Sequence, residues 1–201
     1  MMASVSKVSG TLDRREVVKR ILERRGEALV VTGLGSSCYD AGVYDHPNTF
    51  YLWGAMGAAA MIGLGLALAQ PSRKVVVITG DGEMLMGLGS LATIGAQRPA
   101  NLSIVVLDNE LYAETGMQAT HTARGVDLAT MAKGAGFRVA EAVRSEDELA
   151  RGIEAIYATQ GTVFLDVKVN ATRYPMSIRL RDGTHIKNRF RENLLGSAAF
   201  D

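Results

Sequence analysis

The stretch KVVVITGDGEMLMGLGSLATIGAQRPANLSIVVLDN, residues 74–109, decides the fold of this chain. Two β-rich apolar runs, VVVI and IVVL, flank a segment with helical patterning, which is typical of a strand–helix–strand unit. Asp81 follows the first run in a Gly-Asp-Gly turn, and Asn109 follows the second. Ligands bind beyond the carboxyl ends of the strands in an open parallel sheet, so we expect these two residues to lie close together there.

The rest of the chain repeats this alternation of short β-rich runs with helical runs. Strands are predicted at 27–33, 74–80, 102–109, 138–143 and 162–169, and helices at 12–25, 57–69, 86–97, 127–137 and 145–159. The alternation predicts an α/β fold, a doubly wound, mostly parallel sheet with helices on both faces. Residues 1–170 are predicted to form this domain. Residues 171–201 break the pattern and are predicted to form an arm and a short helix, not a separate domain, lying on a partner or on the domain's own flank.

The composition narrows the classes of function. The chain has 201 residues and a net charge of +1, so no nucleic-acid partner is expected, and the pair Arg14 and Arg15 is interpreted as part of a solvated helix face. One cysteine, Cys38, excludes an internal disulfide or a multi-cysteine zinc site and favours a reducing, cytoplasmic location. The most apolar stretch, residues 55–70, is short and glycine-rich, which predicts a buried helix and no membrane span.

Asp81 and Asn109 both offer hard oxygen ligands, and neither has a cysteine or histidine beside it that would suit zinc. Such donors suit a magnesium ion that completes its octahedron with phosphate oxygens and water. Gly80 and Gly82 would let the backbone approach a phosphate, and the amides of Gly82 and Glu83 would face the anion at a helix start. The stretch therefore predicts a metal–diphosphate site. The alternative is that Asp81 and Asn109 are polar turn residues that cap helices.

The Gly-Asp-Gly turn and Asn109, with 26 residues between Gly82 and Asn109, resemble the diphosphate-binding motif of thiamine diphosphate (ThDP) enzymes. The longer run of residues 80–122, GDGEMLMGLGSLATIGAQRPANLSIVVLDNELYAETGMQATHT, resembles the β subunit, or the C-terminal half, of the sulfopyruvate and phosphonopyruvate decarboxylases. The likeness extends from about Leu29 to about Val169. It implies a ThDP- and Mg²⁺-dependent enzyme that converts a 2-oxo acid to an aldehyde and carbon dioxide.

The resemblance also implies roles for individual residues. Asp81, Asn109 and the backbone carbonyl of Leu111 would bind Mg²⁺. The residues near the cofactor's diphosphate would be Gly35, Ser36, Ser37, Gly80, Gly82, Glu83, Tyr112, Ala113, Glu114 and Thr115. For Ser36 and Ser37 the alternative is a helix N-cap.

The same resemblance assigns the loop of Gly54, Ala55 and Met56 to the aminopyrimidine ring. The Gly54 carbonyl would accept a hydrogen bond from the 4′-amino group, and Met56 would be the apolar wedge that bends the cofactor. For Met56 the alternative is ordinary core packing. His46, His121, His185 and Cys38 are interpreted as structural, with substrate contact by His46 and catalysis by His121 as the alternatives.

ThDP enzymes of this kind need a glutamate beside the pyrimidine N1′, and it comes from a second, pyrimidine-binding domain. One sheet already occupies the 201 residues of this chain, which leaves no room for that domain. Glu83 and Glu110 lie at the diphosphate end and are poor substitutes. We therefore expect a separate α subunit of similar size, in an α2β2 or larger hetero-oligomer.

The chain departs from the family pattern at four positions. It has Ala58 where the family often has histidine, and it has Glu110, Ala113 and Met117 where the family often has glycine. These departures leave the 2-oxo acid open among sulfopyruvate, phosphonopyruvate and a less anionic acid. A carboligase or oxidoreductase subunit and a non-catalytic scaffold subunit are further alternatives. A nucleotide-binding Rossmann protein would require Gly-x-Gly-x-x-Gly after the first strand, which GLGSSC only half matches.

Overall fold

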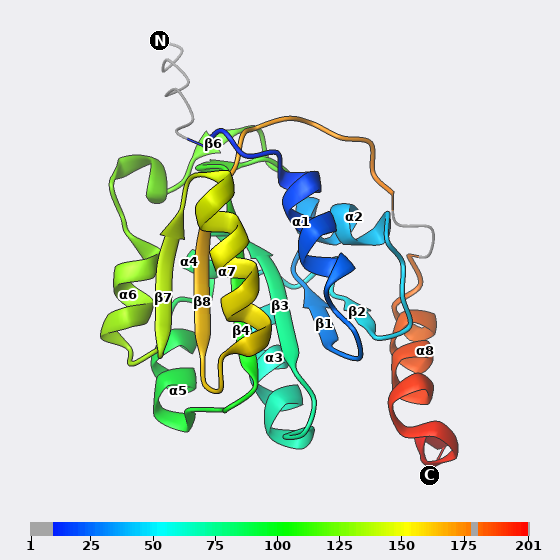
Figure 1. The fold of residues 1–201 in the computed structure, drawn as a ribbon. Helices are drawn as coiled ribbons and strands as arrows, with labels where there is room; N and C mark the ends of the chain where they lie inside the picture. The colour runs from blue at the N-terminus through cyan, green and yellow to red at the C-terminus, as the bar shows by residue number, and fades with distance from the viewer. Residues whose placement is uncertain (1–9, 178–180, 201) are drawn as a thin grey trace.

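The computed structural model describes residues 10–177 and 181–200, and its centre is a six-stranded, wholly parallel sheet (Figure 1). The strand order is β2-β1-β3-β4-β8-β7. The strands span Leu29–Thr32 (β1), Thr49–Tyr51 (β2), Val75–Gly80 (β3), Leu102–Asp108 (β4), Val139–Val143 (β7) and Val163–Lys168 (β8). A small antiparallel hairpin, Leu111–Tyr112 (β5) with Gln118–Ala119 (β6), lies beyond the carboxyl end of the sheet.

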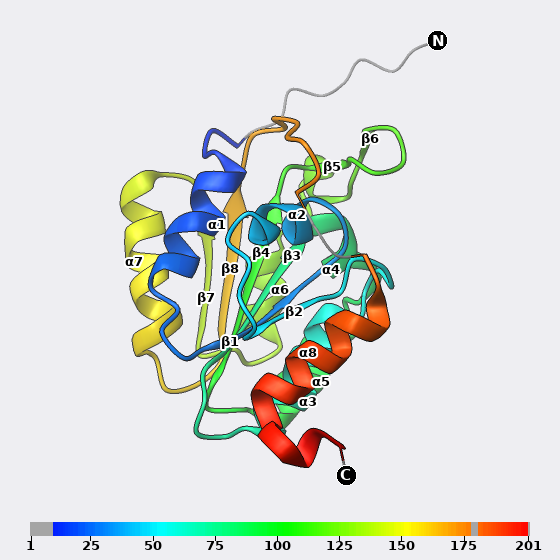
Figure 2. The same ribbon diagram turned by 90° about the vertical axis from the view of Figure 1, so that its right-hand side faces the viewer.

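Helices cover both faces of the sheet, which confirms the predicted doubly wound fold. One face carries α1 (Arg14–Glu23), α2 (Ser36–Gly42) and α7 (Glu146–Ala158). The other carries α3 (Ala59–Ala69), α4 (Asp81–Met86), α5 (Ser90–Gln97), α6 (Leu128–Gly134) and α8 (Gly183–Leu195). Figure 2 shows α1 and α7 on one side of the sheet and α3, α5 and α8 on the other.

The sheet is buried on both sides, because each face packs against a layer of helices. Every residue of β1, β4 and β8 is buried. Along β4 and β8, Val105 and Leu165 belong to the core under α1 and α7, whereas Ile104 and Phe164 belong to the opposite core. Complete burial of an aliphatic or aromatic side chain of this size stabilises a fold by about 1.5–3 kcal/mol.

Several elements differ from the predictions, among them the β5–β6 hairpin, which was not predicted. The helix predicted at 86–97 is two helices, α4 and α5, and α4 begins five residues earlier than predicted, at Asp81. At the break, Gly87 lies close to the loop before α3, since an added Cβ at Gly87 would overlap the carbonyl oxygen of Gly57. Helix α2 and the three-residue strand β2 were not predicted from the sequence, since both are too short to show a clear apolar period.

The C-terminal tail returns over the domain. Residues 171–177 are extended and run along the carboxyl edge of the sheet, and α8 then packs beside β2 (Figure 1). The rings of Phe190 in α8 and Phe50 in β2 lie with their centroids 5.6 Å apart. The division of the chain at residue 170 stays a prediction, and residues 1–9, 178–180 and 201 lie outside the described part. No helix in the described residues is long and apolar enough to cross a membrane.

A glycine in α5 sets how closely α5 approaches α6. An added Cβ at the buried Gly95 would overlap the backbone carbonyl oxygen of Ala135, so we expect Gly95→Ala to destabilise the chain by about 1–3 kcal/mol. Gly65 in α3 is the matched control, because it is exposed and an added Cβ meets nothing there within 4 Å. Gly65→Ala is expected to stabilise by about 0.5–1 kcal/mol. Denaturant unfolding of both variants measures the difference, and equal effects would contradict the close approach.

Candidate functional site

A cavity of about 80 Å³ opens at the carboxyl edge of the sheet, beside the ends of β1, β3 and β4. Most of the predicted site residues line it: Ser36, Ser37, Met56, Gly80, Asp81, Gly82, Glu83, Asn109, Leu111, Tyr112, Ala113, Glu114 and Thr115. Gly35, Gly54 and Ala55 do not belong to its lining. Gly35 is the N-cap of α2, next to the Glu114 side chain, and Ala55 is exposed with a left-handed φ of 56°.

Asp81 is the first residue of α4 and is 2% exposed. The Thr120 hydroxyl donates to its Oδ2 over 2.6 Å. Burial, followed by the neighbouring Asp108 carboxylate, raises the pKa of Asp81 to about 7. No salt bridge within the described residues reaches Asp81, so this buried carboxylate lacks a compensating cation.

Asn109 lies beside Asp81 because β3 and β4 pair in register, with Gly80 opposite Leu107. The side chain is 7% exposed, and its Oδ1 accepts a hydrogen bond of 3.0 Å from the Leu111 amide. This bond closes a tight turn at the start of the hairpin. The carboxyl edge therefore presents one carboxylate and one amide in the lining of the same cavity.

These donors fit magnesium rather than a metal held by protein side chains alone. Within the described residues, no group of three or more His, Cys, Asp or Glu side chains is arranged to hold a metal. Mg²⁺ commonly binds through one or two carboxylate or amide oxygens and takes its remaining ligands from phosphate and water. Binding of Mg²⁺ by Asp81, Asn109 and the Leu111 carbonyl stays a prediction, and the uncompensated Asp81 supports it.

Glu83 connects two loops of the site. Its Oε2 accepts a hydrogen bond of 2.8 Å from the Leu34 amide, and its Oε1 accepts one of 3.4 Å from the Ala59 amide. An added Cβ at Gly33 would overlap this carboxylate. The side chain of Glu83 thus fixes the loop after β1 against the start of α3, in addition to lining the cavity.

The β5–β6 hairpin closes one side of the cavity. An added Cβ at Gly82 would overlap the Tyr112 ring, so Gly82 lets the hairpin lie directly on α4. Two non-glycine residues of the hairpin, Glu110 and Met117, have a left-handed backbone with a φ of 63°, a conformation that glycine adopts more easily than other residues. These are two of the positions at which the resembling family often has glycine.

A buried polar cluster below the cavity was missed from the sequence. The Thr122 hydroxyl donates to Asp108 over 2.9 Å and lies 2.9 Å from the Thr120 hydroxyl, which binds Asp81. The Lys168 ammonium contacts Asp108 and lies 3.2 Å from Asp166. Burial would lower the pKa of Lys168, but Asp166 and Asp108 outweigh it and raise this pKa.

Burial of the Asp166 carboxylate accounts for much of the desolvation cost of this cluster. Both of its carboxylate oxygens are buried without a hydrogen bond, although the Lys168 ammonium lies near. Burial and the Asp108 carboxylate raise the pKa of Asp166 to about 7. The sequence signal was the pair of polar residues, Asp166 and Lys168, on one face of a strand that is otherwise apolar.

The three histidines and Cys38 lie outside the cavity, whereas Ser36 and Ser37 line it. His46 Nδ1 accepts from the Asn48 amide over 3.0 Å within a turn, and His121 and His185 are exposed. Cys38 is buried, and burial raises the pKa of its thiol to about 12, which does not suit a nucleophile. The Ser37 hydroxyl donates to the Leu34 carbonyl over 3.1 Å, and neither serine caps α2 through its side chain.

The prediction that Arg14 lies on a solvated helix face is wrong. Arg14 is 5% exposed, lines the cavity and contacts Asp40 of α2 through its Nε. Because helix α2 was not predicted, no buried carboxylate was expected beside α1.

Comparison with known proteins agrees with this geometry. Residues 34–167 match the family described as thiamine pyrophosphate enzyme, C-terminal TPP binding domain. The chain belongs to this family. The match confirms the predicted family and the predicted cofactor, thiamine diphosphate.

Similar proteins are named as decarboxylases. The chain is 41% identical to sulfopyruvate decarboxylase subunit beta of Methanothermobacter thermautotrophicus over 187 residues, which are 92% of this chain and 97% of that protein. It is 41% identical to phosphonopyruvate decarboxylase of Streptomyces viridochromogenes over 158 residues, 78% of this chain but 39% of that protein. A solved structure of a putative ThDP-dependent enzyme from Mycobacterium smegmatis shares the fold, with a TM-score of 0.69 and 24% identity over 80% of this chain and 32% of that one.

The left-handed Met117 gives a test of the hairpin backbone. Met117→Gly and Met117→Ala both delete the side chain, but only glycine adopts a φ of 63° without strain. We therefore expect the glycine variant to be about 1 kcal/mol more stable than the alanine variant. Thermal unfolding of the two variants measures this difference, and equal midpoints would show that the left-handed backbone is not retained.

The raised pKa of Asp166 predicts a pH dependence of stability. The carboxyl has a pKa of about 7 in the folded chain against an ordinary 3.8, so between these values the folded chain holds a proton that the unfolded chain has lost. The contribution of this carboxyl to stability is therefore most favourable at about pH 4 and below, falls as the pH rises towards 7, and carries the full penalty above 7.

Asp166→Asn removes this penalty. The stability of the variant relative to wild type is expected to rise between pH 4 and 7, because only the wild type bears the growing cost of ionising this buried carboxyl. Urea unfolding across this range measures the change, with the exposed Asp147→Asn as the control. A relative stability that stays constant with pH would refute the assignment to Asp166.

Proposed function

We propose that this chain is the diphosphate-binding β subunit of a ThDP- and Mg²⁺-dependent 2-oxo acid decarboxylase of the sulfopyruvate type. The observation that carries the proposal is the buried pair of Asp81 and Asn109 at adjacent strand ends, in a domain of the thiamine pyrophosphate enzyme family. The substrate class is supported by the likeness to a sulfopyruvate decarboxylase β subunit along 97% of that protein.

Bound ThDP would supply the electron sink that lets a 2-oxo acid lose carbon dioxide. Asp81, Asn109 and the Leu111 carbonyl would hold the Mg²⁺ that binds the diphosphate. Tyr112, packed on Gly82, would close the diphosphate end from water. Met56 lines the cavity and is half-buried, which leaves its side chain available as an apolar support for the cofactor.

We further propose that an α subunit completes the pyrimidine end of the site. Glu83 is already engaged by the Leu34 and Ala59 amides, so it is a poor candidate for activating the pyrimidine. Large apolar side chains are exposed around the pyrimidine loop: Trp53 is 39%, Met61 42% and Met86 64% exposed. Met86 is near this loop because the neighbouring Gly87 contacts Gly57.

Helix α3 supports the same conclusion. It begins just after the pyrimidine loop and contains no polar residue along its eleven positions. A helix that is apolar all round is ordinarily covered on every side, yet Leu68 on α3 is 50% exposed. The name of the relative, subunit beta, is consistent with a hetero-oligomer, for which we propose α2β2 or larger, located in the cytoplasm.

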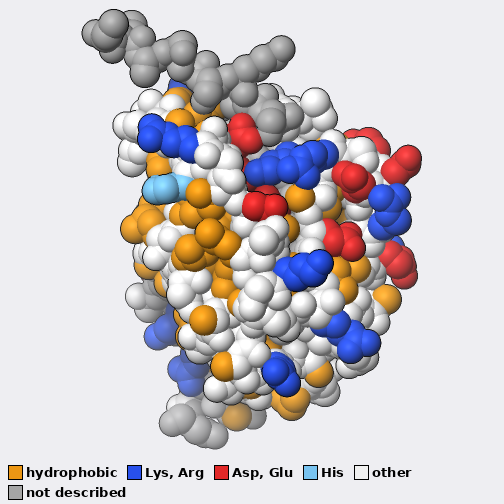
Figure 3. All heavy atoms as spheres, turned by 90° about the vertical axis from the view of Figure 1, so that its left-hand side faces the viewer, with side chains coloured by type: hydrophobic (Ala, Val, Ile, Leu, Met, Phe, Trp, Pro, Cys, Tyr) orange, Lys and Arg blue, Asp and Glu red, His pale blue; other side chains and the backbone are white. Residues whose placement is uncertain are grey.

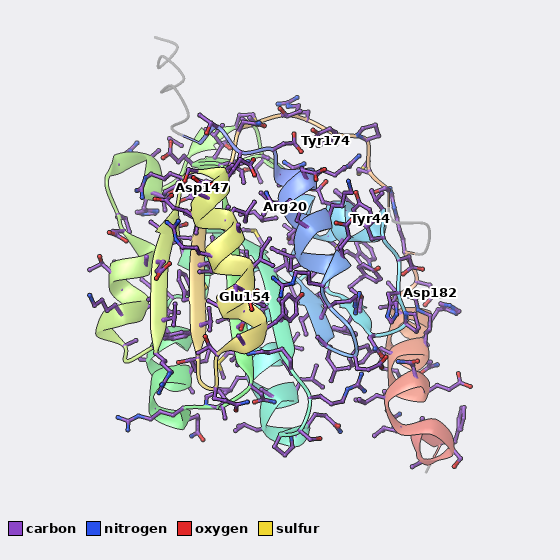
Figure 4. The ribbon with its side chains drawn as sticks, in the orientation of Figure 1. Arg20, Tyr44, Asp147, Glu154, Tyr174 and Asp182 are labelled. Atoms are coloured by element: carbon purple, nitrogen blue, oxygen red, sulfur yellow. The ribbon has the colours of Figure 1, made fainter. Side chains whose placement is uncertain are left out.

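Figure 3 shows another face of the molecule, on which hydrophobic side chains gather on one half and charged side chains on the other. The charged half is the side of α7, which carries the exposed Glu146, Asp147 and Glu154 (Figure 4). This contrast supports a solvent-facing α7 and favours subunit contacts on the side of the opposite helices.

Phosphonopyruvate is the second candidate substrate, because a phosphonopyruvate decarboxylase is equally similar over a shorter length. Carbon dioxide release from sulfopyruvate, phosphonopyruvate and pyruvate is therefore the deciding assay, with ThDP and Mg²⁺, on the chain alone and on the complex isolated from its host. We expect activity only in the complex. Turnover by the chain alone would refute the need for an α subunit.

Asp81→Asn tests the metal site independently of turnover. We expect Mg²⁺-dependent ThDP binding to weaken by about 100-fold or more, since the variant loses a charged ligand of a buried site. Calorimetric titration of the chain measures this affinity. Asp147→Asn on α7 is the matched control and should bind as wild type does (Figure 4). Equal affinities for the two variants would refute the role of Asp81.

A further inference from the structure

A second cavity, of about 180 Å³, adjoins the diphosphate cavity. Its walls come from α1, α2, the β5–β6 hairpin and the arm of residues 171–176. Arg14, Ser36, Asn109 and Glu114 line both cavities, so the two are neighbours. Figure 4 shows Tyr174 on the arm above the first turn of α1.

Arg14 is the buried charge at this junction. The residue is 5% exposed, and three contacts fix its guanidinium. Its Nε contacts the Asp40 carboxylate, its Nη1 donates to the Thr172 carbonyl over 3.4 Å, and its centre lies 5.7 Å from the Tyr174 ring. Its Nη2 makes no hydrogen bond within the described residues, although the residue lines both cavities.

The carboxylates near Arg14 are already engaged. Asp40 is fully buried and is the shared partner of Arg14 and Arg15, whose Nε lies 3.0 Å from Asp40 Oδ1. One carboxylate thus faces two guanidinium groups, and the further carboxylate nearby, that of the half-buried Asp13, is engaged by the Tyr174 hydroxyl and the Glu16 amide. Arg15 is further held by the Pro175 carbonyl at 3.2 Å and by the Tyr174 ring at 4.2 Å.

Glu114 is the negative group in the same walls. It lies on the hairpin loop and is exposed, whereas Arg14 is buried and held by α2 and the arm. Water therefore screens the carboxylate of Glu114 more than the guanidinium of Arg14. The carboxylates of Asp81 and Glu83 line the first cavity alone, whereas Arg15 and Arg173 join Arg14 in the walls of the second. The side of the junction that faces the second cavity is therefore the side that favours an anion.

We propose that Arg14 binds a phosphate- or sulfonate-class oxyanion at the junction of the two cavities, with Nη2 as the donor. A planar guanidinium held by other contacts is well suited to oxyanions, because its remaining N–H groups are already oriented. The inference rests on the proposed function for the source of the anion, which is either the terminal phosphate of the cofactor or the anionic tail of the substrate.

The first test uses the unsubstituted chain and needs no activity. Inorganic phosphate and methanesulfonate are titrated at millimolar concentrations while NMR follows the arginine side-chain Nε and Nη signals. We expect the Arg14 signals to shift and those of the exposed Arg24 to stay in place. An unmoved Arg14 signal would overturn the proposal even if every variant failed to fold, whereas loss of decarboxylase activity would bear only on the proposed function.

The second test uses variants that keep the fold. Arg14→Lys retains the charge and loses the planar fork, and the double variant Arg14→Met with Asp40→Asn removes both buried charges together. Arg24→Met is the control, because Arg24 is the C-cap of the same helix and pairs with Glu154 at the surface. Loss of a charged hydrogen bond should weaken oxyanion binding about tenfold or more in both Arg14 variants.

The same variants identify the source of the anion. If Arg14 binds the cofactor, the affinity for ThDP falls about tenfold while that for thiamine monophosphate is unchanged. If it binds the substrate tail, ThDP binds normally and KM rises for sulfopyruvate but not for pyruvate in the complex. Wild-type affinity of folded Arg14 variants for phosphate, ThDP and both acids would show that Arg14 is purely structural, and would overturn the proposal.

Discussion

The constraint on which the site depends is an excess of buried negative charge at the carboxyl edge of the sheet. Asp81, Asp108 and Asp166 are all nearly inaccessible to water, and the nearby cation in the described residues is Lys168. Burying ions is costly unless they are paired, and here the pairing is incomplete. A divalent cation bound at Asp81 would compensate the remaining charge. Relief of this unpaired charge would add to the binding free energy of a metal at Asp81. The Thr120 hydroxyl donates to Asp81 and the Thr122 hydroxyl donates to Asp108, and both bonds hold the carboxylates in position.

The parallel sheet is what brings these charges together. Neighbouring parallel strands end at the same edge, so β3, β4 and β8 deliver Asp81, Asp108 and Lys168 to one place without any loop having to carry them there. The hairpin that follows β4 then folds back over this edge. Its path requires Gly82 beneath Tyr112 and a left-handed backbone at Met117. Strain of this kind persists where surrounding contacts over-determine the conformation.

The sequence was sufficient for the parts of the site that depend on chain order. The β-branched runs before Asp81 and Asn109 predicted two buried strands, and parallel pairing placed their polar ends together. Arg14 was misjudged because its partner lies 26 residues away, in a short helix with no clear apolar period. Lys168 was missed for a different reason, since a buried polar residue in an apolar strand becomes interpretable only when its neighbour across the sheet is known.

The two ends of the cavity differ in a way that matches the two ends of the cofactor. The diphosphate end has the uncompensated Asp81 for a metal and the guanidinium of Arg14 for an oxyanion, both fixed by buried contacts. The pyrimidine end has an exposed loop with Trp53 and Met61 beside it and the wholly apolar α3 behind it. One end of the site is thus nearly complete within this chain, whereas the other presents apolar surface that a folded domain ordinarily covers. Under the proposed function, this asymmetry fits a cofactor site divided between two subunits: the charge that would anchor the cofactor lies in this chain, and the open surface lies where a second chain would bring the activating group.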